Sequence, residues 1–161
     1  MERGIVLHSQ LLASPCIALR IRDRTPHLHK SAQLEFLTSH SDGAINSWQM
    51  TQHDLHNSTF QSAPPTSSQQ ENEQPNVPHV FISAEFLYHA PTHSYTVLLG
   101  TAAGALVLFD EQKKLFMQEA SPTLPPEIRD SAITVLSASA EYLFIGNARG
   151  LLWRAWLEFS L

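Results

Sequence analysis

Residues 36–48, which read FLTSHSDGAINSW, decide the fold of this 161-residue chain. An apolar run is followed by a small residue, Ser39, by three turn residues, by Gly43 and by a second run that ends in Trp48. Glycine accepts the positive φ that tight turns between β-strands often need, so this stretch predicts a β-hairpin.

The same arrangement occurs twice more along the chain. Residues 97–109 read VLLGTAAGALVLF, and residues 143–156 read LFIGNARGLLWRAW. A small residue lies four positions before each turn glycine, and an aromatic residue lies five or six positions after it. Further β-type runs precede the hairpins at 16–21, 80–86 and 133–137, and others follow at 115–117 and at either 53–56 or 58–61. The pattern predicts an all-β chain of about three repeated units with four short strands each.

The composition shifts mark where one unit ends and the next begins. We place the units at about 14–61, 79–118 and 131–161. The stretch between the first two, 62–78, is rich in Ser, Gln, Asn, Glu and Pro and has hardly an apolar side chain to bury, which predicts a flexible inserted loop. An apolar run at 4–12 is expected to be the outermost strand of a neighbouring unit.

The first hairpin resembles the WD-repeat family of β-propellers. Residues 39–48 are similar to the end of the second strand, the turn and the third strand of such a repeat, with Asp42 six positions before Trp48. The other units have Ala103 and Arg149 in place of this aspartate, and no unit starts with a Gly-His pair. These departures count against the Asp–His–Ser/Thr–Trp hydrogen-bond network of regular repeats. The resemblance covers about residues 5–161 and implies a partial β-propeller of about three four-stranded blades.

Two other structures compete with this interpretation. Short strands separated by turn residues also suit a β-sandwich, and residues 151–161 could form an amphipathic helix. Recurrence of one hairpin favours the propeller. Its inner strands are covered on both faces, and the nearly continuous apolar runs at 95–99 and 105–109 fit that environment. The last segment alternates instead, which predicts a strand with one wetter side.

Composition and charge narrow the classes of function. The chain is 43% hydrophobic, and ten Lys and Arg against fifteen Asp and Glu give a net charge of -5, which counts against nucleic acid as the main ligand. Its apolar runs are shorter than a membrane span requires, and its N-terminus lacks the apolar core of a secretory signal. One cysteine fits a reducing compartment. We therefore expect a cytoplasmic or nuclear protein without a membrane span.

Few residues offer catalytic or metal chemistry. His27 and His29 could place two imidazoles on one side of a strand, with His40 or Glu35 as a third ligand, but a polar loop is the simpler interpretation, as it is for His53 and His56. Cys16 begins an apolar strand, which favours a small buried core residue over a nucleophile. No nucleophile elbow or phosphate-binding glycine loop occurs in the sequence. We expect neither an enzyme nor a bound cofactor, metal or small-molecule substrate.

The resemblance implies that the chain recognises other proteins. In such propellers the turns between second and third strands share one rim with the connections between blades. The candidate partner-binding residues on this rim are His40, Asn147, Arg149 and Asp130. The expected function is a non-catalytic interaction scaffold within a multiprotein complex. The alternatives are a subunit that completes a partner's open propeller by edge-strand docking and, less favoured, a metal-dependent hydrolase.

Three blades are fewer than the four to eight that close a ring. An open ring exposes two apolar blade faces and unpaired strand edges to water. We therefore expect the chain either to belong to a longer propeller protein or to dock onto a partner, and not to be stable as an isolated monomer.

Overall fold

A computed structural model describes residues 14–22, 34–51, 54–61, 79–89, 94–117, 124–139 and 141–156. Within these ranges the chain forms strands and turns and has no helix, which confirms the all-β class. No helix long and apolar enough to cross a bilayer is found in these ranges either. The predicted loop at 62–78 and the predicted strand at 4–12 lie outside the described residues.

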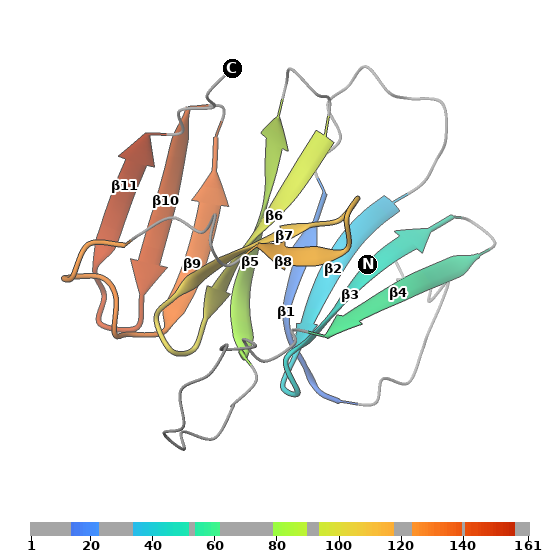
Figure 1. Cartoon of the computed structure of the whole chain (residues 1–161), viewed down its shortest axis with the longest axis horizontal. Coiled ribbons are helices and arrows are strands. Elements are labelled where there is room, and N and C mark those ends of the chain that lie inside the picture. The colour runs from blue at the N-terminus through green and yellow to red at the C-terminus, as the bar shows by residue number, and fades with distance from the viewer. Residues whose placement is uncertain are drawn as a thin grey trace, which may run out of the picture.

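The described strands form three antiparallel sheets, and within each sheet the strands follow one another in chain order (Figure 1). The first sheet contains β1 (Cys16–Ile21), β2 (Leu34–His40), β3 (Ala44–Met50) and β4 (Leu55–Gln61). The middle sheet contains β5 (Phe81–His89), β6 (Ser94–Thr101), β7 (Leu106–Asp110) and β8 (Leu115–Met117). The third sheet contains β9 (Ile133–Ala138), β10 (Tyr142–Asn147) and β11 (Leu152–Trp156).

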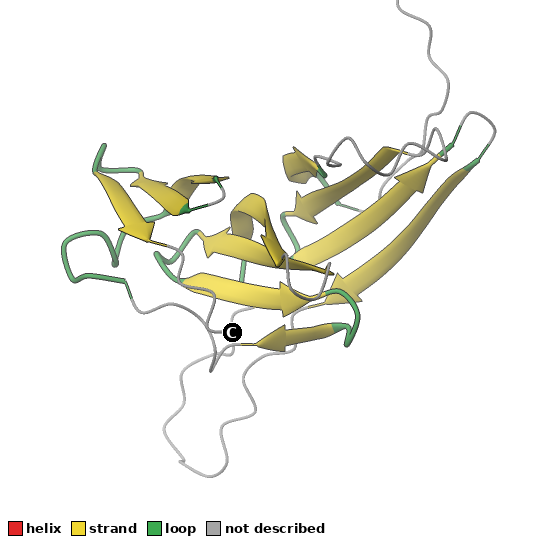
Figure 2. Ribbon diagram, turned by 90° about the horizontal axis from the view of Figure 1, so that it is seen from above, coloured by secondary structure: helices red, strands yellow, loops and turns green. Residues whose placement is uncertain are grey.

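This arrangement counts against the two alternatives to the propeller. The middle sheet lies between the other two, so the strands do not form the two facing layers of a sandwich (Figure 2). Residues Leu152–Trp156 form strand β11, so the prediction of a helix is wrong there. Of the two alternative fourth strands of the first unit, residues 55–56 and 58–61 belong to one strand, β4, and residue 53 lies outside the described residues.

The three predicted hairpins are confirmed. They join β2 to β3, β6 to β7 and β10 to β11. Gly43, Gly104 and Gly150 occupy the turns with φ of 81°, 90° and 79°, in the left-handed region where a side chain would be strained. The glycine recurs in the sequence because each of the three turns needs a residue with left-handed backbone at that position.

A β-bulge recurs at one position in all three sheets. In each sheet the first strand has one extra residue opposite the last residues of the second strand; the extra residues are Ile17, Ile82 and Thr134. Bulges increase local twist and bend the strand that carries them. The repeat thus extends beyond the hairpin to a detail of strand pairing that the sequence pattern did not indicate.

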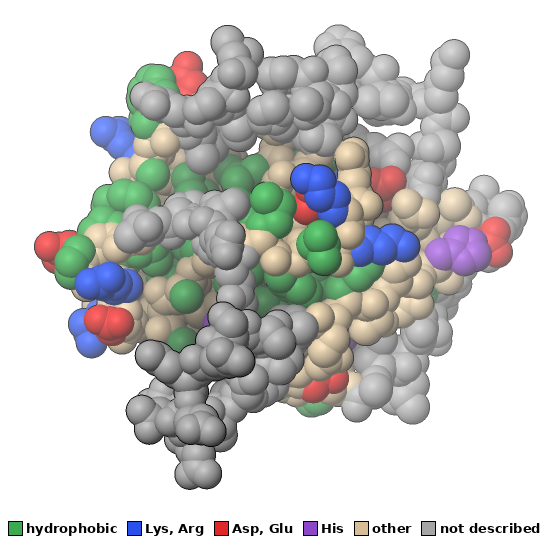
Figure 3. Space-filling view, in the orientation of Figure 1, with side chains coloured by type: hydrophobic (Ala, Val, Ile, Leu, Met, Phe, Trp, Pro, Cys, Tyr) green, Lys and Arg blue, Asp and Glu red, His purple; other side chains and the backbone are tan. Residues whose placement is uncertain are grey.

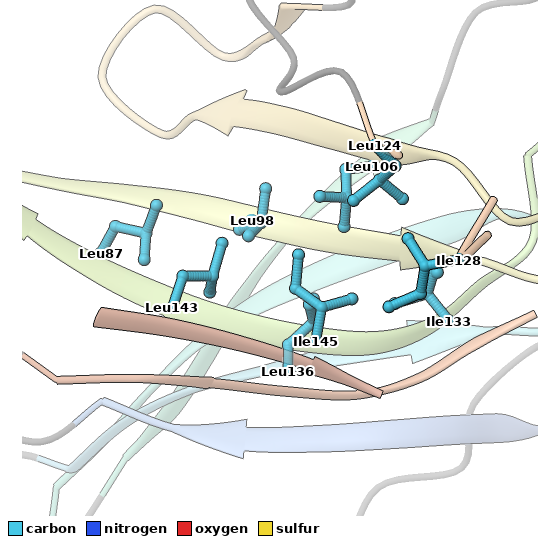
Figure 4. Close-up of a cluster of buried hydrophobic side chains, with 9 residues drawn as sticks. All are labelled: Leu87, Leu98, Leu106, Leu124, Ile128, Ile133, Leu136, Leu143 and Ile145. Carbon is cyan, nitrogen blue, oxygen red and sulfur yellow. The ribbon is translucent and has the colours of Figure 1, made fainter. Parts of the chain in front are cut away.

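The core lies on both faces of the middle sheet. Along β6 the side chains alternate, so Val97 and Leu99 pack toward the first sheet and Leu98 packs toward the third. Figure 4 draws the cluster between the middle and third sheets, which includes Ile133 and Ile145. A strand buried on both faces needs apolar side chains at successive positions, which explains the continuous apolar run predicted for an inner strand.

The third sheet has one covered face. Trp153 and Ala155 pack against the cluster shared with the middle sheet, whereas Leu152 and Trp156 are exposed on the other face. The alternation predicted for this segment is therefore confirmed over β11.

The small residue before the second turn glycine, Gly100, also has a physical cause. A Cβ added to Gly100 would lie 2.3 Å from Ser83 Oγ and 2.7 Å from Ile133 Cγ2. Ser83 Oγ also donates a buried 2.6 Å hydrogen bond to the carbonyl oxygen of Ile133, on the next sheet. The sheets approach so closely here that position 100 has no room for a side chain.

Candidate interaction surface

The three hairpin turns lie at one edge of the molecule, the lower edge in Figure 1. Each turn is fastened to the chain just before its own sheet's first strand by the same type of backbone hydrogen bond. Ser41 N donates to Pro15 O at 3.1 Å, Ala102 N donates to Val80 O at 2.9 Å, and Ala148 N donates to Ala132 O at 2.9 Å. We call this edge, with turns 41–43, 102–104 and 148–150 and segment 124–132, the rim. Each turn of the rim is thus held against its own sheet by a backbone hydrogen bond.

Two of the four candidate partner-binding residues are buried under this rim. His40 is only 2% exposed, and Asn147 is also buried. Asn147 Nδ2 donates to Ile128 O at 3.1 Å, while its Oδ1 accepts from the backbone N–H groups of Arg149 and Leu151, each at 3.1 Å. Both occupy the last position of a second strand, as Thr101 does, and that position faces inward in every sheet. The expectation that these two side chains face a partner is corrected: they hold the turns in place.

His40 belongs to a buried hydrogen-bonded chain on the face of the first sheet turned away from the middle sheet. Trp48 Nε1 donates to Thr38 Oγ1 at 2.8 Å, and Thr38 Oγ1 lies 2.9 Å from His40 Nε2. His40 Nδ1 lies 3.2 Å from the carbonyl oxygen of Ser14. Because that carbonyl can only accept, the pattern places the imidazole proton on Nδ1 and leaves Nε2 to accept from Thr38. The sequence departures counted against such a network, yet a Trp–Thr–His chain is present in the first sheet.

Asp42 stabilises the first turn but is not part of the Trp48–Thr38–His40 hydrogen-bond network. Its exposed carboxylate accepts from Ala44 N at 3.0 Å. This backbone hydrogen bond is the main reason why the pKa of Asp42 lies below its usual value. Thr101 Oγ1 and Asn147 Oδ1 accept from the equivalent region of their own turns, from Ala105 N and Leu151 N. A side-chain oxygen thus supports each turn, although the residue that supplies it differs.

The other two candidates are exposed on the rim. Arg149 lies in the β10–β11 turn, and Asp130 lies just before β9 with a left-handed φ of 64°. Asp130 also lines a shallow groove of about 230 Å³ between segment 124–130 and the Gly104 turn. Leu106 and Leu124 give this groove apolar walls, and Arg129 adds a cation. Asp130 and Arg149 therefore remain available to a partner, together with a groove that the sequence did not indicate.

The sequence analysis missed a buried carboxylate that connects all three sheets. Glu85 on β5 accepts from Arg20 Nε at 2.9 Å and Arg20 Nη2 at 2.5 Å. It also accepts from Phe86 N at 2.9 Å and from Ala138 N, at the end of β9, at 3.1 Å. Four donors offset the loss of water around the charge.

Arg22 forms a second unpredicted cluster, between the first and middle sheets. Its guanidinium lies 4.8 Å from the ring centroids of both Phe86 and Tyr95 and forms ion pairs with Glu35 and Glu111. Arg22, Glu35, Phe86 and Glu111 line a cavity of about 210 Å³. The available signal in the sequence is that Arg22, directly after the predicted strand at 16–21, lies two positions from Arg20 and would share its side if the strand continued. Glu35, considered above as a metal ligand, is here a partner of Arg22.

The described residues contain no cluster of three or more His, Cys, Asp or Glu side chains suited to a metal ion. His27, His29 and His53 lie outside the described residues, and His56 is exposed on β4. Cys16 is exposed, so the prediction of a buried core cysteine is wrong. Partial burial still raises the pKa of the Cys16 thiol, which lowers its thiolate fraction and hence its reactivity.

Comparison of the chain with protein-family models and with the sequences of curated proteins finds no match. The argument for function therefore rests on the repeated geometry and on the rim.

Proposed function

We propose that this chain forms blades of a WD-repeat-type β-propeller and acts as a non-catalytic scaffold that binds other proteins within a larger cytoplasmic or nuclear assembly. The observation that carries the proposal is the repetition of one sheet design. In each sheet the first three strands follow one another in the same order, with the same bulge, the same left-handed glycine and the same type of backbone hydrogen bond from the turn. Radially repeated antiparallel sheets are the architecture of propellers.

The hydrogen-bonded chain of the first sheet supports the WD-repeat resemblance. It links a tryptophan of the third strand, Trp48, to a threonine of the second, Thr38, and on to a histidine. Asp42 lies in the intervening turn, six positions before Trp48, as in that family's pattern. Here the histidine, His40, comes from the second strand itself, which explains how the network forms without a Gly-His pair at the start of the unit.

The proposed mechanism is geometric. The rim turns are fixed by backbone and buried side-chain hydrogen bonds, so a partner that binds across several of them orders little of the scaffold. Arg149 and Asp130 offer opposite charges on this surface, and the groove beside Asp130 offers apolar walls. Arginine is enriched at interaction hot spots, which makes Arg149 the leading contact residue. The expected partners are proteins with mixed apolar and charged surfaces.

A second candidate is a structural subunit that completes a partner's open propeller by edge-strand docking. The observation that favours it is the exposure of Leu151, Leu152 and Trp156 on and beside β11. This candidate uses the end of the sheet array, whereas the scaffold uses the rim, so variants in the two regions separate them.

The test is affinity purification of the tagged chain from its own cells, followed by identification of the bound proteins. Arg149→Glu reverses an exposed rim charge, and Asp130→Asn removes another while keeping a residue that tolerates left-handed backbone. Glu141→Arg is the matched control, because Glu141 is exposed in the turn at the opposite end of β10. We expect both rim variants to lose specific partners at least tenfold while keeping their circular dichroism spectra. Equal recovery of partners by all variants would overturn the scaffold proposal.

A further inference from the structure

The contact between successive sheets has a direction. Counted from the turn glycine, the residues six before and two after it face the next sheet. In the first sheet these are Leu37 and Ile45, which lie in the cluster shared with the middle sheet. In the middle sheet they are Leu98 and Leu106, which lie in the cluster shared with the third sheet. We call this side of a sheet its forward face.

The third sheet has a forward face of the same kind, and no other sheet in the described part of the chain covers it. Its equivalent residues are Phe144, which is half-buried, and Leu152, which is 72% exposed. Val135 and Trp156 lie on the same face, at 52% and 59% exposure. Hydrophobic side chains reach the surface over the third sheet in the space-filling view (Figure 3). Exposed apolar surface of this kind marks an interaction site.

The first sheet has exposed apolar residues on its opposite face, the one turned away from the middle sheet, which we call its backward face. Two positions of each first strand pack against the preceding sheet: in β5 these are Ala84 and Phe86, and in β9 they are Leu136 and Ala138. The equivalent residues of β1 are Leu19 and Ile21, which pair with β2 at the same register. Among the described residues no sheet precedes β1, and these two side chains are 58% and 51% exposed. The open part of this backward face is the β1 side, since Thr38 and Trp48 are buried on the same face.

We propose that two copies of this chain join so that the forward face of the third sheet in each copy covers the β1 side of the first sheet in the other. The occupant follows from the structure, because one chain carries both halves of a contact that it already makes twice internally. A two-fold axis relating the copies covers both exposed faces of both copies at once. Under this symmetry, if residue i of one copy contacts residue j of the other, then residue j of the first copy also contacts residue i of the second. The six sheets of the pair fall within the range that closes a propeller ring. This inference rests on the blade arrangement in the proposed function and not on the rim.

The internal contacts also predict which residues meet across the new interface. Ser83 Oγ reaches Ile133 O of the next sheet at 2.6 Å. By strand register, Val135 is the third sheet's equivalent of Ser83, and Cys16 is the first sheet's equivalent of Ile133. Val135 of one copy should therefore lie beside Cys16 of the other. Cys16 is an exposed free thiol, so a cysteine at position 135 can report this contact.

The experiment combines mass measurement with cross-linking of the full chain. Light scattering after size exclusion should give twice the 18.0 kDa of a single chain. Leu152→Glu should raise the dissociation constant at least tenfold. Leu115→Glu should leave it unchanged, because Leu115 is equally apolar and 58% exposed but lies on β8, away from both faces. Circular dichroism checks that both variants fold.

Under oxidised glutathione, Val135→Cys should form a covalent dimer that disappears when Cys16→Ser is added. Thr59→Cys, exposed on the outer strand β4, should not form one with Cys16. A monomer at 100 µM, equal effects of Leu152→Glu and Leu115→Glu, or no bond between positions 135 and 16 would overturn the proposal. A monomer that binds a different protein in a Leu152-dependent way would also overturn the proposal. It would show that a sheet of another protein covers the forward face. None of these outcomes affects the recovery of partners by the Arg149 and Asp130 variants, so a failure of the dimer proposal can be told apart from a failure of the scaffold proposal.

Discussion

Arg20 and Glu85 connect the first and middle sheets through a two-pronged ion pair, with Nε and Nη2 of the guanidinium at 2.9 Å and 2.5 Å from the two carboxylate oxygens. The carboxylate is buried, whereas the Arg20 side chain is 43% exposed. Because Glu85 also accepts from Ala138 N, one side chain joins β1, β5 and β9, the first strands of the three sheets. The sheets are thus held together by a polar link as well as by apolar packing.

Replacing Glu85 with glutamine should destabilise the fold. Glu85→Gln removes the charge that Arg20 faces and leaves an amide group near Ala138 N or Phe86 N, which are also donors. Breaking a fully buried pair costs about 3–5 kcal/mol, and the exposed part of Arg20 lowers the expected loss to about 2 kcal/mol. Urea unfolding of Glu85→Gln and of the exposed control Glu141→Gln checks this. Equal unfolding midpoints for the two variants would contradict the link.

Thr38→Val should remove the centre of the buried chain in the first sheet. Valine has nearly the shape of threonine but leaves Trp48 Nε1 without its acceptor and His40 Nε2 without its nearest donor. Asn46 Nδ2, 3.2 Å from His40 Nε2, remains as a donor to the imidazole, so Trp48 Nε1 is the buried group that loses its partner. An unpaired buried group costs about 1–3 kcal/mol, so we expect a loss of about 2 kcal/mol. Thr59→Val is the matched control, because Thr59 is exposed on β4. The control should change the unfolding free energy by less than about 0.5 kcal/mol. If Thr38→Val lowers the free energy of unfolding no more than the control does, these buried hydrogen bonds contribute little to stability.

The hairpins and the all-β class could be predicted because their causes are local. A glycine at a left-handed turn and an apolar run on each side are visible in a short window of sequence. The burial of β6 and β7 on both faces was predictable for a similar reason, because such strands have apolar side chains at successive positions.

The burial of His40 and Asn147 could not be predicted in this way. In the sequence, a polar residue at the end of a second strand looks the same whether the segment before the first strand of its sheet covers it or leaves it in water. That covering depends on contacts such as Asn147 to Ile128, which are nineteen residues apart. The role of Glu85 was hidden for the same reason, because its partners lie on strands of two other sheets.

Gly104→Ala and Gly150→Ala form a matched pair of substitutions. Both glycines are left-handed, at φ of 90° and 79°, so alanine strains the backbone at each by about 1 kcal/mol. At Gly150 the new Cβ meets nothing within 4 Å, whereas at Gly104 it would lie 2.7 Å from the backbone N atoms of Asp130 and Ser131. Segment 124–132 must then move, so Gly104→Ala should cost about 1–3 kcal/mol more. Thermal unfolding measures the difference. Similar losses for the two variants would show that the segment is not packed on the turn.

Asp110 should make stability depend on pH in the acid range. Its Oδ1 accepts from Gln112 N and Lys113 N, each at 3.0 Å, and the Lys113 backbone bond is the main reason why its pKa is lowered. The unfolded chain has a carboxyl pKa of about 3.9, so just below that pH the unfolded state binds more protons than the folded state. The contribution of Asp110 is therefore fully present above the unfolded pKa and is lost as the pH falls through the lower folded pKa.

Asp110→Asn removes this titration while keeping an oxygen acceptor. The free energy of unfolding of the native chain should exceed that of Asp110→Asn by a constant amount between pH 5 and pH 7, and this excess should shrink between about pH 4 and pH 2. Urea unfolding at half-unit steps of pH measures it, with Thr59→Val as an exposed control that removes no titrating group. An excess for Asp110 that stays constant down to pH 2 would mean that the turn does not hold the charged carboxylate.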